Sequence, residues 1–584
     1  MRINIGRYNL DLSKIIFFCC MILGIVFLAW RAPYGYCFND EPFIVTLGQR
    51  ISFGDSLIFD EWNMAQPISP FIAFFYIIYV FFHGSTEGIL LAFRYIYCLI
   101  WITVCSSIMW FFLNNKYINN YFSERCLLKV FMSISVFFYL VLFSPLDYMT
   151  LSYTSMGLSS VLVIALFLFH IPKDNKTHFV FWLFLGILVS LNVLCCPWMA
   201  LFYIGLFIFA VIYFAIKGRY NGQVLSSYII LMIVVIVLMM IYCGLWIFNN
   251  NDISEFIPNL KMVFDDPGHT GSVIDRIING IIRLFKYSKK SSFIYLAVLL
   301  VLLVFNKYLT KVRLLVIPFV IIGFVISEYT FFARYFYSGL NYQMLNIIPV
   351  GYLSFFMLKK KPWKAFIVFG GIGIVYSISS QLSSDTKLMA ISMALSVCGV
   401  GAFFFIFLLF GELFTNYSSI GCKCITSFVF SIIICTQIGV EFITRVGRQY
   451  WDNPPFSLSE TITVGAAKGL KTTKERKESY ELQYNNMTSL MNLADVPKDK
   501  QFVNFHFNPV LYLDASMNYG TFSAWDYGYS NEELNQRYNN YYAINKSKKP
   551  EVVFCFSDED VYDWFDTRSY SMYEHNGSKL FVQK

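Results

Sequence analysis

Charged residues are scarce in this sequence, and their scarcity excludes a soluble globular enzyme. Only 14% of the 584 residues are charged, whereas 57% are hydrophobic and 19% are aromatic. The mean hydropathy is +0.55. Soluble globular domains have about 25% charged residues. The composition therefore excludes a soluble globular protein and predicts a polytopic α-helical membrane protein.

Familiar catalytic motifs are also missing. The sequence has no Walker loop, no dinucleotide fingerprint after a strand, no Gly-x-Ser-x-Gly elbow and no His-Glu-x-x-His pair. Most of the 14 cysteines lie in or beside apolar runs, where cysteine behaves as a small hydrophobic residue. We expect chemistry whose substrate needs no nucleotide site in this chain.

Long apolar runs are what the chain does contain. The first, 15–30, ends without a small-residue cleavage site, so we interpret it as a retained anchor rather than a signal peptide. Together with it, the apolar runs predict about thirteen membrane spans. The other predicted spans are 89–113, 127–143, 154–171, 179–196, 199–216, 224–247, 293–305, 312–326, 345–358, 365–378, 388–410 and 425–440.

The distribution of basic residues predicts the orientation. Arg2, Arg7 and Lys14 precede the first span, which places the N-terminus in the cytoplasm. The short outer loops 144–153 and 195–198 then carry no lysine or arginine. Much of the net charge of +8 lies in cytoplasmic loops, so it reports orientation and implies no nucleic-acid partner.

Two segments depart from this pattern. The apolar run 71–82 is shorter than the roughly 20 residues that cross a bilayer, and we expect an interfacial or re-entrant helix there. An odd number of spans places residues 445–584 outside the cell. Their composition predicts a small extracytoplasmic α/β domain, separate from a membrane module of residues 1–444. Its predicted strands lie near 501–505, 551–556 and 579–582.

Acidic residues in the outer loops are the first candidates for catalysis. Asp40 and Glu41 follow the first span, in the outer loop 31–70, and a partly buried carboxylate there could act as a general base. An ordinary helix start, capped by Asn39 or Asp40 with Pro42 in the first turn, is the alternative, and both explanations can hold together. Asp60-Glu61, in the same loop, we interpret as a solvated or capping pair.

A third acid and several cations come to the same predicted face. Asp147 lies between the third and fourth spans, where it is either a second functional carboxylate or a cap for the next helix. Arg334 and Tyr335 precede a late span, and the arginine either binds a phosphate or merely extends to the interface. The long outer loop 248–292 adds Lys261 and Lys286, which either attract anionic headgroups or form a solvated face.

These motifs together resemble the GT-C glycosyltransferases, most closely the branch of protein O-mannosyltransferases and the lipid A aminoarabinose transferase. The resemblance rests on Asp40-Glu41 with the loop pattern that follows in 43–50 and on the proline-containing segment 66–70 before the interfacial run. It rests further on Asp147 and on Arg334-Tyr335. Gln66 departs from the family pattern, which has His or Lys before these prolines, and residues 445–584 match no family motif.

The resemblance implies a fold and a reaction. It implies a GT-C membrane module that takes a hexosyl or pentosyl group from a polyprenyl-phosphate donor and transfers it, with inversion, to a cell-surface glycan, a lipid glycan or a protein. By resemblance Asp40, aided by Glu41, is the base, and Asp147 orients the acceptor. Arg334, Tyr335, Lys261 and Lys286 bind the donor phosphate. A divalent metal held by Asp40 and Asp147 is left open.

Three other functions remain as alternatives at this point, one of them a catalytically inactive scaffold whose C-terminal domain binds a partner, which the presence of Asp40-Glu41 disfavours. A transporter or flippase of a lipid-linked sugar would carry carboxylates at mid-membrane on broken helices. A glycan polymerase or ligase would concentrate its chemistry in one late outer loop such as 248–292. The sequence places its notable acids in outer loops, which favours the transferase.

Overall fold

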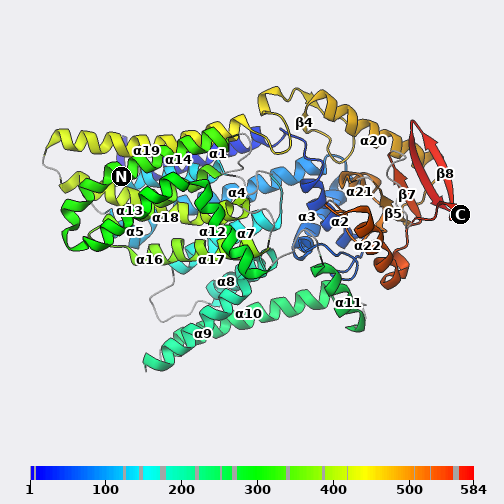
Figure 1. Ribbon diagram of the computed structural model, residues 1–584, viewed down its shortest axis with the longest axis horizontal. Coiled ribbons are helices and arrows are strands. Elements are labelled where there is room, and N and C mark those ends of the chain that lie inside the picture. Colours follow the sequence, from blue (N-terminus) through cyan, green and yellow to red (C-terminus); the bar gives the residue numbers. More distant parts are fainter. Residues whose placement is uncertain are drawn as a thin grey trace.

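The computed structural model is an elongated molecule in which a helical bundle occupies one side and a smaller part with a sheet occupies the other (Figure 1). The structure describes residues 2–5, 8–122, 126–143, 149–170, 179–217, 222–249, 253–265, 272–336, 342–383, 388–416, 419–505, 507–526, 528–556 and 565–584. A short hairpin of β1 (Arg2–Ile5) and β2 (Tyr8–Asp11) precedes the bundle.

Helices occupy all of the predicted spans. They are α1 (Leu12–Arg31), α4 (Ile89–Asn114), α6 (Cys126–Val141), α7 (Tyr153–Phe169), α8 (Phe179–Cys195), α9 (Met199–Lys217), α10 (Gly222–Trp246), α13 (Lys289–Val304), α14 (Leu309–Arg334), α15 (Ile347–Met357), α17 (Ile372–Ser383), α18 (Leu388–Asn416) and α19 (Ile420–Gly447). A short helix α5 (Lys116–Tyr121) follows α4, and α16 (Trp363–Ala365) and the π-helical η6 (Phe366–Gly371) lead into α17.

The bundle is that of a multi-pass membrane protein. Among the described residues, eight helices are long and apolar enough to cross a membrane, or nine if α12 and α13 count as one bent span. α18 is the central helix, since 89% of its most apolar window is buried, whereas only 17% of the window in α1 is buried. The outer helices therefore expose apolar surface that only lipid can cover.

Two predicted spans end too early. From the apolar runs we expected spans that end at 326 and 440, but α14 continues to Arg334 and α19 continues to Gly447. Glu328 and Glu441 consequently lie within membrane helices and not in outer loops. These two acids were not singled out from the sequence, and the helices bury both carboxyl groups.

The predicted interfacial helix lies beside the end of the bundle. Gln66–His83, made of η1 (Gln66–Ile68) and α3 (Ser69–His83), reaches the length of a span. However, its first residue Gln66 accepts a hydrogen bond from Ile58 N in the first loop, and just beyond its end Gly88 N donates to Gly465 O of the C-terminal part. Both ends therefore contact segments outside the bundle helices, and the interfacial position of this helix stays a prediction.

The long loop 248–292 is largely helical. It contains α11 (Ile253–Phe264) and the strongly amphipathic α12 (Val273–Tyr287). α12 meets α13 at 96°, so it runs across the bundle end while α13 runs along the bundle.

The C-terminal part forms the predicted α/β unit, whose described residues also include four strands that the sequence did not indicate, β3, β4, β6 and β8. A five-stranded sheet has the order β6 (Asn518–Tyr519), β5 (Gln501–Asn504), β7 (Val552–Cys555), β9 (Ser578–Gln583), β8 (Tyr570–His575). β6, β5 and β7 are parallel neighbours, and β9 and β8 extend the sheet antiparallel. The other elements are β3 (Glu460–Thr461), β4 (Lys471–Thr472), η7 (Pro455–Ser457), α20 (Lys474–Leu493), α21 (Val510–Ala515), α22 (Asn531–Ile544) and η8 (Lys546–Lys548).

This C-terminal part packs on the loop after α1. Lys471 donates its N–H to Pro33 O at 2.7 Å and accepts from Gly35 N at 2.8 Å, and Trp62 N donates to Phe522 O at 2.8 Å. One hydrophobic cluster runs from the bundle helices into the interior beneath the sheet. In Figure 1, α2, α3, α21 and α22 accordingly lie together between the bundle and the sheet.

Candidate active site

The acidic pair opens helix α2 (Asp40–Ser52). The Asn39 side chain caps this helix by accepting a hydrogen bond from Asp40 N at 2.8 Å, and Pro42 stands in the first turn. Both carboxylates lie in the first turn, where the helix dipole favours negative charge. The capping explanation and the functional explanation of the pair are thus compatible.

Glu41 is fully engaged by an arginine. Arg94 on α4 is 2% exposed, and its Nε and Nη2 donate to Glu41 Oε2 at 3.1 and 2.5 Å. The same guanidinium donates to the carbonyl oxygens of Ala32, Tyr34 and Gly35 at 2.8, 3.0 and 2.8 Å. The other Glu41 oxygen, Oε1, accepts from Met149 N at 3.1 Å. Glu41 therefore holds three segments together.

Asp40 makes no such ion pair with any residue that the structure describes. Its Oδ2 accepts a hydrogen bond from the Tyr450 hydroxyl at 2.7 Å, and the Cys37 thiol lies 3.9 Å away. Burial raises the pKa of Asp40 to about 6; the Tyr450 hydrogen bond opposes this rise and the Glu41 charge adds to it. A carboxyl group with a pKa near 6 can take up a proton near neutral pH, which is what a general base must do.

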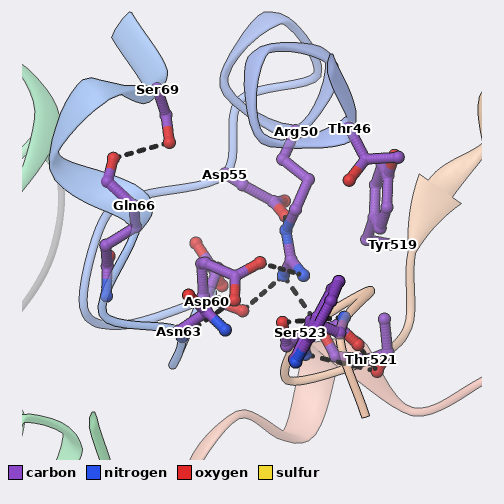
Figure 2. A network of polar contacts seen from close by, with 12 residues as sticks. Thr46, Arg50, Asp55, Asp60, Asn63, Gln66, Ser69, Tyr519, Thr521 and Ser523 are labelled. Atoms are coloured by element: carbon purple, nitrogen blue, oxygen red, sulfur yellow. Dashed lines mark hydrogen bonds and ion pairs between the residues drawn. The ribbon is translucent and has the colours of Figure 1, made fainter. Parts of the chain in front are cut away.

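A buried ionic network fixes the other end of α2 (Figure 2). Arg50 is 1% exposed; its Nε lies 2.7 Å from Asp55 Oδ2 and its Nη1 lies 2.9 Å from Glu61 Oε2. Its Nη2 donates to the backbone carbonyls of Thr521, at 3.0 Å, and Asp60. Figure 2 shows these groups converging on the guanidinium from the first loop and from the C-terminal part.

The same network corrects one expectation from the sequence. Asp60 and Glu61 were expected to be a solvated or capping pair, but Glu61 is 2% exposed and pairs with Arg50. Asp60 Oδ2 does accept a local bond, from Ser56 N at 2.7 Å, and Lys548 approaches the Asp60 carboxylate to 3.6 Å. The pair is thus structural, because buried acids need partners from elsewhere in the chain.

Some of the proposed phosphate-binding residues come together. The Tyr335 ring lies 4.9 Å from the ring of Tyr287 and 5.6 Å from that of Tyr342, which joins the ends of α12 and α14. Lys286 and Arg334, each next to one of these tyrosines in sequence, are exposed at this junction. Cationic side chains therefore lie beside three packed tyrosines, Tyr287, Tyr335 and Tyr342, which we call the Tyr335 cluster.

The other proposed residues are placed differently. Lys261 is exposed on α11, whose neighbouring residues bond elsewhere: Asn259 Oδ1 accepts from Trp62 at 2.9 Å and Met262 O accepts from Arg537 at 3.0 Å. Asp147 lies outside the described residues. Within the described part of the chain, no three His, Cys, Asp or Glu side chains are grouped closely enough to hold a metal ion.

Reasoning from the sequence missed three residues of this region. Arg94 looked like a span residue and Tyr450 like part of a linker, and nothing local signals their long-range partners. Arg448 was not singled out either, yet it opposes the rise that burial and Tyr335 cause in the pKa of Tyr342, as does Arg283, one of the cations noted in the loop 248–292. Because Arg448 and Tyr450 are two residues apart, this short segment connects Asp40 to the Tyr335 cluster.

Comparisons with known proteins give a fold likeness only. No protein-family model matches the sequence, and no curated protein matches it. The chain is similar to ArnT from Cupriavidus metallidurans, solved bound to undecaprenyl phosphate, with 9% identity over 97% of each chain and a TM-score of 0.45. It is also similar to the oligosaccharyltransferase AglB from Archaeoglobus fulgidus, solved with an inhibitory peptide and a dolichol-phosphate. The sequence identity to AglB is 11% over 98% of this chain and 74% of the AglB chain, with a TM-score of 0.41.

At these identities and TM-scores the likeness carries no argument. The functional argument rests on the site itself.

Proposed function

We propose that this protein is an inverting glycosyltransferase that moves a sugar from a polyprenyl phosphate to an acceptor hydroxyl on the extracytoplasmic side of the membrane. One observation carries the proposal: Asp40, at the start of α2, is a partly buried acid with a pKa of about 6 and a tyrosine as its hydrogen-bond donor. Its neighbour Glu41 forms an ion pair with Arg94. A single poised carboxylate at the bundle end is suited to general-base catalysis.

The proposed reaction is one displacement. The acceptor oxygen attacks the anomeric carbon, the bond from that carbon to the phosphate oxygen breaks, and Asp40 takes the proton of the acceptor hydroxyl. The lipid phosphate leaves with the bonding electrons. Cations near the Tyr335 cluster, among them Arg334 and Lys286, are suited to stabilising its charge.

The other proposed roles are revised accordingly. Glu41 positions α2 instead of sharing the proton transfer, because both of its oxygens already accept hydrogen bonds. Arg283 and Arg448 join the candidates for phosphate binding, and Lys261 is the weakest of them. Acceptor orientation by Asp147 remains a proposal from the family resemblance, as does a membrane module of residues 1–444 separate from 445–584.

The deciding experiment compares Asp40→Asn with wild type in transfer of radiolabelled sugar from extracts that contain polyprenyl-phosphate sugars. We expect the variant to lose on the order of 10²-fold or more in kcat/KM, because an amide cannot take the proton. Asp499→Asn, at an exposed acid of the C-terminal part, is the matched control and should retain full activity. Equal transfer by wild type and Asp40→Asn would refute the proposed base.

A transporter of a lipid-linked sugar is the second candidate, because Glu328 and Glu441 lie inside membrane helices. The same preparations distinguish the two. Movement of labelled lipid between leaflets, without any sugar transfer by wild type, would favour the transporter.

A further inference from the structure

Two buried acids lie at the same depth on two membrane helices, away from Asp40. Glu328 on α14 is 6% exposed and Glu441 on α19 is 1% exposed. Each stands six residues before the last residue of its helix, which is about 9 Å at 1.5 Å per residue. Both helices run in the same direction, so the two carboxyl groups lie about two turns below the end of the bundle that carries α2.

The two carboxyl groups belong to one polar cluster. The Glu328 charge acts on Glu441, so the groups are close enough to repel each other. Gln437 connects the cluster, since its Nε2 donates to Glu441 Oε1 at 2.7 Å and to Gln343 O at 2.9 Å. Asn346 lies beside Glu328, but that contact lacks the geometry of a hydrogen bond.

The cluster has an excess of oxygen acceptors. Within the part of the chain that the structure describes, no partner is found for either oxygen of Glu328, for Glu441 Oε2, for Gln343 Oε1 or for Gln437 Oε1. The amide of Gln437 cannot be turned around, because its Nε2 makes both bonds named above. These five acceptors outnumber the donors of the same region that also lack partners, Asn346 Nδ2 and Tyr295 OH.

No positive side chain compensates the two acids. Among the described residues, no lysine or arginine charge acts on either carboxyl group, whereas the charge of Arg445, one turn beyond Glu441, acts on Cys98. Two uncompensated carboxylates in a low-dielectric interior cost several kcal/mol each. Ionisable residues inside membrane helices are therefore rare and mark a function.

The Glu328 side chain also lines an open space. A groove of about 300 Å³ lies between α14 and α19, and its wall is apolar except for Glu328, Tyr329 and Thr436. The carboxyl group thus reaches both the cluster and a space outside the packed interior.

We propose that this cluster is a binding site for a hard metal cation, held by the carboxylates of Glu328 and Glu441 with the amide oxygens of Gln343 and Gln437. Carboxylate and amide oxygens are the ligands that calcium and magnesium take in proteins. Two carboxylates would neutralise a divalent ion. The site is separate from the acidic pair of α2 and does not depend on the proposed transferase reaction.

The test uses the full chain in nanodiscs, stripped with a chelator and returned to chelator-free buffer. CaCl2, MgCl2 or NaCl is titrated at constant ionic strength set by choline chloride, while the thermal midpoint of unfolding is followed. We expect a saturable rise with at least one of these metals, because a ligand that binds only the folded state stabilises it. Glu328→Gln and Glu441→Gln should each abolish the rise, and Glu255→Gln, at an exposed acid of α11, should keep it.

A second variant keeps the test decisive if an amide at either position impairs folding. Glu441→Asp retains the negative charge but shortens the side chain by one methylene group, which draws the carboxylate away from the metal. The half-maximal rise in the thermal midpoint should therefore need at least about tenfold more metal than in wild type. The proposal is overturned if no metal produces a saturable rise in wild type, as expected if the acids merely hold protons. It is also overturned if the rise persists unchanged in both glutamine variants.

Discussion

Adjacent carboxylates acquire different roles here because their surroundings differ. Glu41 is paired with Arg94 and accepts a backbone hydrogen bond, whereas Asp40 is partly buried with a phenol and a thiol as neighbours. Pairing favours the charged form and burial disfavours it. Separating the properties of two acids in this way is how one site obtains both a fixed anchor and a titrating base.

The pH dependence of transfer should report Asp40. Because only the ionised form takes a proton, kcat/KM should rise with pH through about 6 and level off above it. Tyr450→Phe removes a hydrogen bond that lowers the pKa of Asp40, so the midpoint should move above 6. Tyr573→Phe, on the edge strand β8, is the control and should leave the profile unchanged. A wild-type midpoint retained in Tyr450→Phe would show that another group titrates.

The same pKa predicts a gain in stability when the acid is removed. The pKa of Asp40 is about 6 in the folded chain and about 3.8 as a reference, so the folded state holds the proton more tightly between these values. Ionised Asp40 therefore lowers the free energy of unfolding at pH 7, by up to about 3 kcal/mol. Asp40→Asn should raise the thermal midpoint at pH 7, and the gain should shrink as the pH falls from 6 toward 4. An equal gain in the thermal midpoint at pH 7 and at pH 4 would contradict this assignment of the pKa to Asp40.

Helix α2 is the element that positions Asp40, and it is fixed at both ends. Arg94 holds its first turn through Glu41, and the Arg50 network holds its last turn. Between them Gly48 allows close packing on α3, since an added Cβ would lie 2.9 Å from Ala73 N. Anchoring at both ends restricts the Asp40 carboxylate to one position relative to the bundle.

Loss of Arg50 should destabilise the protein strongly. Arg50→Met leaves Asp55 and Glu61 buried without their shared cation, which costs about 3–5 kcal/mol. The measurement is the thermal midpoint in nanodiscs together with the transfer rate. Lys548→Met is the matched control: Lys548 also contacts Asp55, but it is partly exposed, so its loss should cost clearly less. Equal losses in the two variants would contradict the central role of Arg50.

The elements were largely predictable from the sequence, whereas their partners were not. Apolar runs located the membrane helices because hydrophobicity is local information. The ends of α14 and α19 were misjudged at Glu328 and Glu441, because an acidic residue normally ends an apolar run and the packing that buries these two acids cannot be read from the local sequence. For the same reason Asp40 was a candidate from its position alone, but its contact with Tyr450, 410 residues away, and the pairing of Glu41 with Arg94 needed the fold.

On the scale of the whole molecule, the C-terminal part completes the site. Tyr519 donates to Gln49 Oε1 at 2.6 Å, Asn545 Nδ2 donates to Phe59 O at 2.9 Å, and Lys548 reaches Asp55. A bundle without these residues would leave the first loop with buried polar groups that lack partners, which is costly. We infer that the two parts depend on each other for stability although their compositions differ sharply.

Cutting the connection between the two parts should therefore leave them associated. Asn453 and Pro454 are exposed, and a protease site inserted between them would separate Tyr450 and the bundle from residues 454–584. We expect the fragments to co-elute from a size-exclusion column in mild detergent, since the contacts at Pro33, Arg50 and Trp62 all remain. Adding Arg50→Met to the cleaved protein should weaken that association. Separation of the fragments without this substitution would show that residues 454–584 are held mainly by the covalent connection.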